Sequence, residues 1–119
     1  AERIWAVFQP HRYTRTKFLF DDFAPAFEGV ERIYVMDIYP ASEAPIPGVT
    51  SQALVKRMRE QGCLGVRYAP AEDEMLREIL TEARPPLMVM TIGAGSVWKV
   101  GEALAEAFTA TRSVATDRT

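Results

Sequence analysis

Four short apolar runs alternate with helical patterns along this chain, and that alternation constrains the fold more than any other feature. The runs are rich in β-branched and aromatic residues and have the length of buried strands. They cover residues 3–8, 32–38, 64–69 and 86–92. Strands that alternate with helices imply crossover connections and a parallel sheet covered on both faces. We therefore predict an α/β fold, a three-layer sandwich with a mostly parallel sheet.

The segments between these runs carry apolar residues at helical spacing. The first pattern follows a possible cap at Thr14 or Thr16, and Pro25 within it predicts a kink or an early stop near residues 22–23. Thr50 or Ser51 is the expected cap of the second helix, and Gly62 its expected end. The repeated apolar positions are Phe20, Phe23 and Phe27; Leu54 and Met58; Met75, Leu76, Ile79, Leu80 and Ala83 after acidic residues 72–74; and Val97, Val100, Leu104 and Phe108.

Bulk properties exclude several classes of protein. The 119 residues are enough for one domain with a real core, and the net charge of −2 argues against a general nucleic-acid binder. No apolar run approaches the length of a membrane span. Cys63 is the single cysteine and is expected as a small buried hydrophobe in the third strand region, so a reduced, cytoplasmic protein is the simplest inference. The chain enters a strand almost at once, which suggests a piece cut from a longer protein.

Three unusual loops follow predicted strands. They read QPHRYTRT (residues 9–16), YPASEAPIPGVTS (39–51) and GAGS (93–96). In an open parallel sheet, ligands bind beyond the carboxyl ends of the strands, so all three loops should lie at one edge. This edge is the candidate site.

The first loop holds the only histidine and two arginines. Arg12 and Arg15 are three residues apart, so their guanidinium groups could converge on a carboxylate or a phosphate, with free amide groups of the helix start adding to the site. His11 could donate a hydrogen bond to a charged oxygen. The alternative is a solvated polar turn in which Tyr13 packs locally.

The other two loops also allow more than one interpretation. Glu43 is the only acid of the proline-rich loop, and it could pair with an arginine, bind a substrate amine or simply lie in solvent. The GAG turn lacks the third glycine of a dinucleotide fingerprint and follows the last strand, so we reject a nicotinamide site. Gly93 and Gly95 more simply let the backbone bend tightly beside a small ligand. No G-x-x-x-x-G-K-[ST] phosphate loop occurs anywhere in the chain.

The strings VFQPHRYTRT, LFDDF, DIYPASEAPIPGVTS and GAGSVWKVGEAL resemble the C-terminal domain of the Mur ligase family. The resemblance runs from residue 3 to residue 108. Two of the strings, FQPHRYTR and YPASEAPIPG, are most like the Mur ligases that join L-alanine to UDP-N-acetylmuramate. Related Mur and folylpolyglutamate ligases share the fold but carry different loops here. The resemblance implies a Rossmann-like domain that binds the incoming amino acid.

For the whole enzyme, the resemblance implies three domains and a role in peptidoglycan precursor synthesis. ATP and Mg²⁺ would convert the lactyl carboxylate of UDP-N-acetylmuramate to an acyl phosphate. The amine of L-alanine would then attack it, forming an amide and releasing phosphate. ATP and Mg²⁺ are expected mainly on the central domain, which is absent here, and no cofactor is expected on the fragment, which should be inactive alone. The implied partners are the two substrates and that central domain, with no nucleic acid and no membrane span.

The same resemblance assigns site residues. Arg12 and Arg15 are the catalytic candidates, since arginines suit the carboxylate of the sugar or of alanine and the charge of the tetrahedral intermediate. The GAG turn would lie near the alanine pocket, and the role of the acid in the proline-rich loop stays open. The substrate-binding candidates are His11, Tyr13, Glu43, Gly93, Ala94 and Gly95.

The chain also departs from the family pattern. A histidine-rich stretch of the form D-Y-x-H-H-P, and the first βα unit that it starts, are absent from the sequence. We therefore expect a domain over residues 1–108 that lacks its first βα unit, with an exposed sheet edge or helix face, and a polar, mobile tail over 109–119. Two other functions stay open: a stand-alone binder of small anions without catalysis, and a structural or interaction domain with well-ordered loops.

Overall fold

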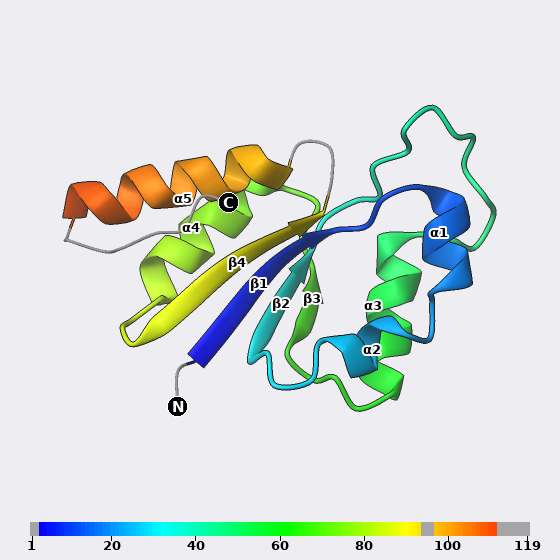
Figure 1. Cartoon of the computed structure of the whole chain (residues 1–119), viewed down its shortest axis with the longest axis horizontal. Coiled ribbons are helices and arrows are strands. Elements are labelled where there is room, and N and C mark those ends of the chain that lie inside the picture. Colours follow the sequence, from blue (N-terminus) through cyan, green and yellow to red (C-terminus); the bar gives the residue numbers. More distant parts are fainter. Residues whose placement is uncertain (1–2, 94–96, 112–119) are drawn as a thin grey trace.

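The computed structural model describes residues 3–93 and 97–111, and it shows a parallel sheet between two layers of helices (Figure 1). The strand order is β3-β2-β1-β4. The strands are β1 (Arg3–Gln9), β2 (Arg32–Val35), β3 (Val66–Tyr68) and β4 (Leu87–Gly93). The helices are α1 (Tyr13–Phe18), α2 (Phe23–Ala26), α3 (Ser51–Glu60), α4 (Glu72–Glu82) and α5 (Val97–Thr111). The predicted three-layer α/β sandwich is confirmed, and all the strand pairs are parallel.

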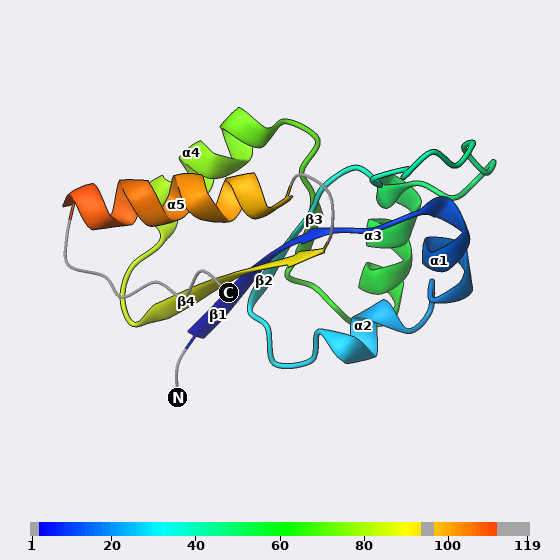
Figure 2. The same ribbon diagram turned by 45° about the horizontal axis from the view of Figure 1, so that its top comes forward.

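The alternation of side chains along β1 creates two cores, one on each face of the sheet. Ala6 and Phe8 pack with α2 and α3, whereas Trp5 and Val7 pack with α4 and α5. Figure 2 shows these two helix groups on opposite sides of the strands. Leu54 of α3 is fully buried, which stabilises the fold by about 1.5–3 kcal/mol relative to an exposed leucine. The two cores hold the sheet rigid beneath the loops that leave its carboxyl edge.

The predicted first helix is in fact two short helices. α1 ends at Phe18, residues 19–22 form a turn, and α2 begins at Phe23. Pro25 lies in the first turn of α2, where a helix needs no backbone N–H, so it starts a new helix and does not kink an old one. The predicted caps are also wrong, because the N-cap of α1 is Arg12 and its side chain makes no capping bond.

The caps of α3 are as predicted, but β3 starts later than expected. Thr50 accepts a hydrogen bond from the Ala53 amide (3.0 Å), and Gly62 follows the helix with a φ of 96°. The third strand begins at Val66, and Leu64, expected in it, is 80% exposed. Cys63 lies in the preceding turn, only partly buried, and this burial raises the pKa of its thiol.

β4 is an edge strand of the sheet and is incompletely covered. Its register pairs Met88 with Ile4, on the sheet face that α1–α3 cover only further along, and Met88 is 47% exposed. α5 packs on the opposite face of β4 and continues to Thr111, three residues into the predicted tail. Residues 112–119 lie outside the described part of the chain. No helix within the described ranges is long and apolar enough to cross a membrane.

Candidate functional site

The loops after β1 and β2 stay paired beyond the ends of their strands. The Tyr39 amide donates to the Pro10 carbonyl (2.9 Å), and the Arg12 amide donates to the Tyr39 carbonyl (2.8 Å). His11 and Tyr39 form an isolated parallel bridge, and their rings stack with centroids 5.7 Å apart and planes 9° from parallel. These contacts join the arginine-bearing turn (residues 9–16) and the proline-rich loop (39–51) into one unit, which we name the strand-end unit. Figure 1 shows this unit beside α1.

Glu43 fastens the proline-rich loop to the start of α1. Its Oε1 accepts from the amides of Tyr13 (2.7 Å) and Thr14 (3.0 Å), and its Oε2 accepts from the Thr14 hydroxyl (2.6 Å). A carboxylate is favourable at a helix N-terminus because it satisfies otherwise free N–H groups. The Thr14 hydroxyl, and then the two amides, hold the pKa of Glu43 below its ordinary value. Glu43 thus replaces the missing cap, and these two amides are not free to bind an anion as we expected.

Three residues other than glycine adopt left-handed backbone in this unit. Arg12 has a φ of 71°, Ala41 of 50° and Ser42 of 74°. Each costs on the order of 1–3 kcal/mol and persists only where surrounding contacts impose it. Here the strained residues stand on both sides of the Glu43 contact. Such strain often accompanies functional sites, and in this fold it is concentrated at the predicted edge.

Arg12 and Arg15 present unpaired guanidinium groups on this unit. Both side chains are exposed, and within residues 3–93 and 97–111 neither forms an ion pair. Arg12 immediately precedes α1 and Arg15 lies in its first turn, so both charges are at the start of this helix. Other arginines of the chain do have carboxylate partners: Arg3, Arg32, Arg57 and Arg67.

Gly93 brings the end of β4 against the end of β1. It pairs with Gln9, and its φ is 135°. A Cβ atom at this position would lie 2.5 Å from the Gln9 carbonyl oxygen, so only glycine fits. The glycine predicted here therefore marks a close approach of two strand ends. Ala94 and Gly95, the other predicted residues of this loop, lie outside the described residues.

Two polar atoms near the end of β1 lack partners. Gln9 is 7% exposed, and its Oε1 is buried without a hydrogen bond, as is Nδ1 of His11. Buried polar atoms normally have partners, so these two atoms are hydrogen-bonding groups that the described residues leave unused. Gln9 was not among the predicted site residues. Its signal is an amide side chain that ends a fully apolar run.

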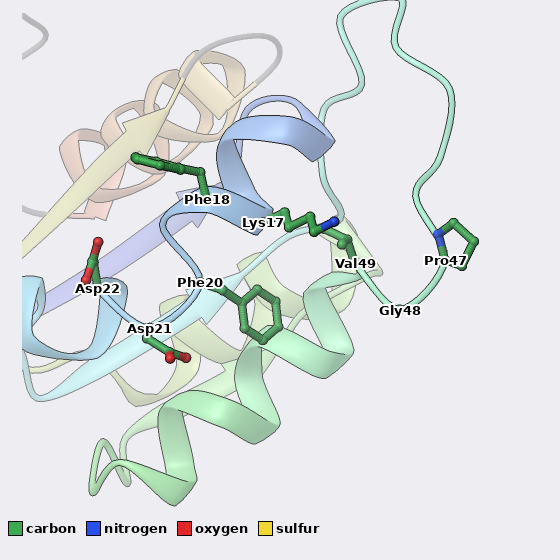
Figure 3. A pocket seen from close by; sticks show the side chains of 8 residues that line it. All are labelled: Lys17, Phe18, Phe20, Asp21, Asp22, Pro47, Gly48 and Val49. Atoms are coloured by element: carbon green, nitrogen blue, oxygen red, sulfur yellow. The ribbon is translucent and has the colours of Figure 1, made fainter.

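A shallow hollow lies at the other end of α1 (Figure 3). Its volume is about 410 Å³, and Phe18 on its rim is 85% exposed. The lining residues are Lys17, Phe18, Phe20, Asp21, Asp22, Pro47, Gly48 and Val49. None of the predicted site residues is among them. The candidate site is therefore the strand-end unit and not this hollow.

Side chains that commonly ligate metals do not gather among the described residues. No group of three or more His, Cys, Asp or Glu side chains in that part of the chain is placed to hold a metal ion. The sequence has no phosphate-binding loop either. What this edge offers is two arginines without an ion-pair partner among the described residues, and such arginines suit a carboxylate or a phosphate.

Comparison with known proteins relates this chain to a group of named ligases. No family model matches the chain. A UDP-N-acetylmuramate–L-alanine ligase of Solibacter usitatus is 48% identical over 104 residues, covering 87% of this chain and 22% of the relative. Ligases of the same name from Syntrophotalea carbinolica and Desulfatibacillum aliphaticivorans are 45% and 43% identical, covering 87% and 93% of the chain and 23% and 24% of the relatives. The chain thus spans less than a quarter of the length of these relatives. Over most of its length, the chain is therefore similar to one segment of the UDP-N-acetylmuramate–L-alanine ligases.

Proposed function

We propose that this chain is the C-terminal, amino-acid-binding domain of a cytoplasmic ATP-dependent ligase that joins L-alanine to the lactyl carboxylate of UDP-N-acetylmuramate. The observation that carries the proposal is the pair of unpaired arginines on a strained, hydrogen-bonded turn at the carboxyl edge of the sheet. The names of the relatives and the predicted motif residues support it. In the complete ligase, another domain would hold ATP and Mg²⁺, and ATP would supply the phosphoryl group.

The work of this domain is positioning and charge stabilisation. Arg12 and Arg15 hold the carboxylate of the sugar or of alanine, and they stabilise the negative charge that develops when the amine attacks the activated carbonyl. His11 and Tyr13 orient the site, and Gly93 lies near the small side chain of alanine. When the tetrahedral intermediate collapses, phosphate leaves and the amide bond remains.

The test is the removal of each arginine in the complete ligase. Arg12→Ala and Arg15→Ala should each lower alanine-dependent ADP release by about a hundredfold, the scale of losing one charge-stabilising donor. Arg77→Ala is the matched control, since Arg77 is an exposed arginine on α4, outside the strand-end unit. Its rate should match that of the unaltered ligase.

The rival functions predict different results. A stand-alone anion binder would bind small carboxylates through the same arginines, and its native chain would show no alanine-dependent ADP release. A structural domain would lose no activity on either substitution. Unchanged rates in both arginine variants would therefore remove the role that we assign to this edge.

We also propose that a βα unit upstream of β1 completes the domain, as the resemblance implies. The incomplete cover of β4 supports this, because Met88 and its neighbour Ile4 lie where a further helix would pack. A version of the protein extended upstream should unfold at a higher temperature and protect Met88 from oxidation. Equal melting temperatures of the two versions would count against the unit.

A further inference from the structure

We propose that Glu43 is a positioning residue, which acts on the reaction by holding Arg12 in place and does not bind the substrate amine. The inference rests on the proposed function, because it assigns a second residue to the same site. It concerns the one acid of the proline-rich loop, whose role neither the sequence pattern nor the resemblance decides.

The contacts of Glu43 lie immediately after Arg12 in the chain. Three donors, from Tyr13 and Thr14, converge on its two oxygens at 2.6–3.0 Å. On the other side, the Arg12 amide donates to Tyr39 (2.8 Å). The backbone that carries the Arg12 side chain is therefore tied to the proline-rich loop both before and after it.

This double attachment matters because the conformation it imposes is unfavourable. Arg12 has a φ of 71° with a ψ of 145°, outside the common left-handed helical region for residues other than glycine. Without the Glu43 bonds, the start of α1 lacks any side-chain cap. A turn of this kind would relax toward negative φ and re-aim the guanidinium group. Orientation errors of this size are costly for a charge that must meet a developing anion.

Both oxygens of Glu43 are already engaged, which argues against direct binding of the substrate amine. An ammonium group would have to displace or share with short hydrogen bonds from Tyr13 and Thr14. The nearby positive charge of Arg12 also favours the carboxylate as it stands and opposes a second cation beside it. Glu43 therefore serves the chain and not the ligand.

A double-mutant cycle in the complete ligase tests this role. Glu43→Ala should lower kcat/KM for the alanine-dependent reaction about tenfold or more, the value of a hydrogen bond to a charged group. In the Arg12→Ala background, the same change should cost less than about threefold, because the group that Glu43 positions is gone. Glu43→Gln should restore activity to within about threefold of the parent, since an amide oxygen can still accept from both backbone amides.

Two further variants keep the test independent of folding. Thr14→Val removes only the hydroxyl contact and leaves the carboxylate in place, so it should show a smaller loss with the same dependence on Arg12. Glu28→Ala is the matched control, since Glu28 is exposed in the turn after α2, outside the strand-end unit, and it should leave the rate unchanged. Circular dichroism verifies that each variant is folded.

The outcomes separate the two proposals. Independent, multiplicative losses from Glu43→Ala and Arg12→Ala would overturn the positioning role, as would a Glu43→Gln variant as poor as Glu43→Ala, which indicates that the charge itself binds the amine. Full activity of Glu43→Ala beside a disabled Arg12→Ala would overturn the positioning role alone. Full activity of Arg12→Ala and Arg15→Ala would overturn the proposed function and the inference with it.

Discussion

Replacing Gly93 by alanine should destabilise the domain more than the same change at another glycine of positive φ. The added Cβ would stand 2.5 Å from the Gln9 carbonyl oxygen, well inside the 3.4 Å at which ordinary contact begins. The strained backbone costs on the order of 1–3 kcal/mol, and overpacking adds about 1–3 kcal/mol. We therefore expect Gly93→Ala to lower the free energy of unfolding by about 2–6 kcal/mol, a large part of the stability of a small domain.

Gly29→Ala is the control, because it carries the strain without the contact. Gly29 has a φ of 91°, and nothing lies within 4 Å of a Cβ built there. Its cost should be roughly 1 kcal/mol, since alanine also reduces the freedom of the unfolded chain. Urea unfolding, followed by circular dichroism, gives the free energy of unfolding of both variants, provided that its dependence on urea concentration is the same for both. If Gly93→Ala shifts the midpoint no more than Gly29→Ala, the ends of β1 and β4 are not held as close as we describe.

Three further predictions concern stability away from the site. Hydrogen bonds from Arg3, and then from Trp5, lower the pKa of Glu31 from 4.5 to about 2. Their contribution to the free energy of unfolding is therefore complete above pH 4.5 and is lost as the pH falls toward 2. Glu31→Gln should remove that part of the dependence of the urea midpoint on acid pH. Leu54→Ala should cost about 3 kcal/mol in the same assay, because the side chain is fully buried and leaves a cavity, and a loss below 1 kcal/mol would mean that the core collapses around it. Thr50→Ala should cost about 1 kcal/mol through the lost cap of α3, whereas Thr50→Ser should restore most of it.

Hydrophobic periodicity was sufficient to predict the layers of this fold. Buried strands and one-sided helices leave patterns of two and 3.6 residues, and these patterns do not depend on distant contacts. Val97, Val100 and Leu104 are all buried, as their spacing predicted. The prediction of a single first helix was wrong because the same apolar spacing fits one long helix or two short ones. Phe20, Phe23 and Phe27 keep helical spacing and pack against the same core, although a turn separates α1 from α2.

The candidate site was predictable in its position but not in its internal contacts. The carboxyl edge follows from topology alone, and it brought the turn that carries Arg12 beside the loop that carries Glu43. The hydrogen bonds between them join residues about thirty positions apart, and no local pattern encodes such a pair. The left-handed φ of Arg12 has no sequence signal either, because glycine or asparagine is the residue expected there.

The two edges of the sheet use arginine in opposite ways. At the amino edge, Arg3 starts β1 and pairs with Glu31 at 2.8 Å, and Arg32 starts β2 and pairs with Glu82 at 2.8 Å. These partly exposed pairs contribute little energy each, but their charges are neutralised within the chain. At the carboxyl edge, Glu43 caps α1, and Arg12 forms no ion pair with any described residue. A chain selected only for stability gains by pairing that arginine too. Glu43 instead accepts hydrogen bonds from the backbone of α1. This arrangement is expected where Arg12 must bind an anion that the chain does not contain.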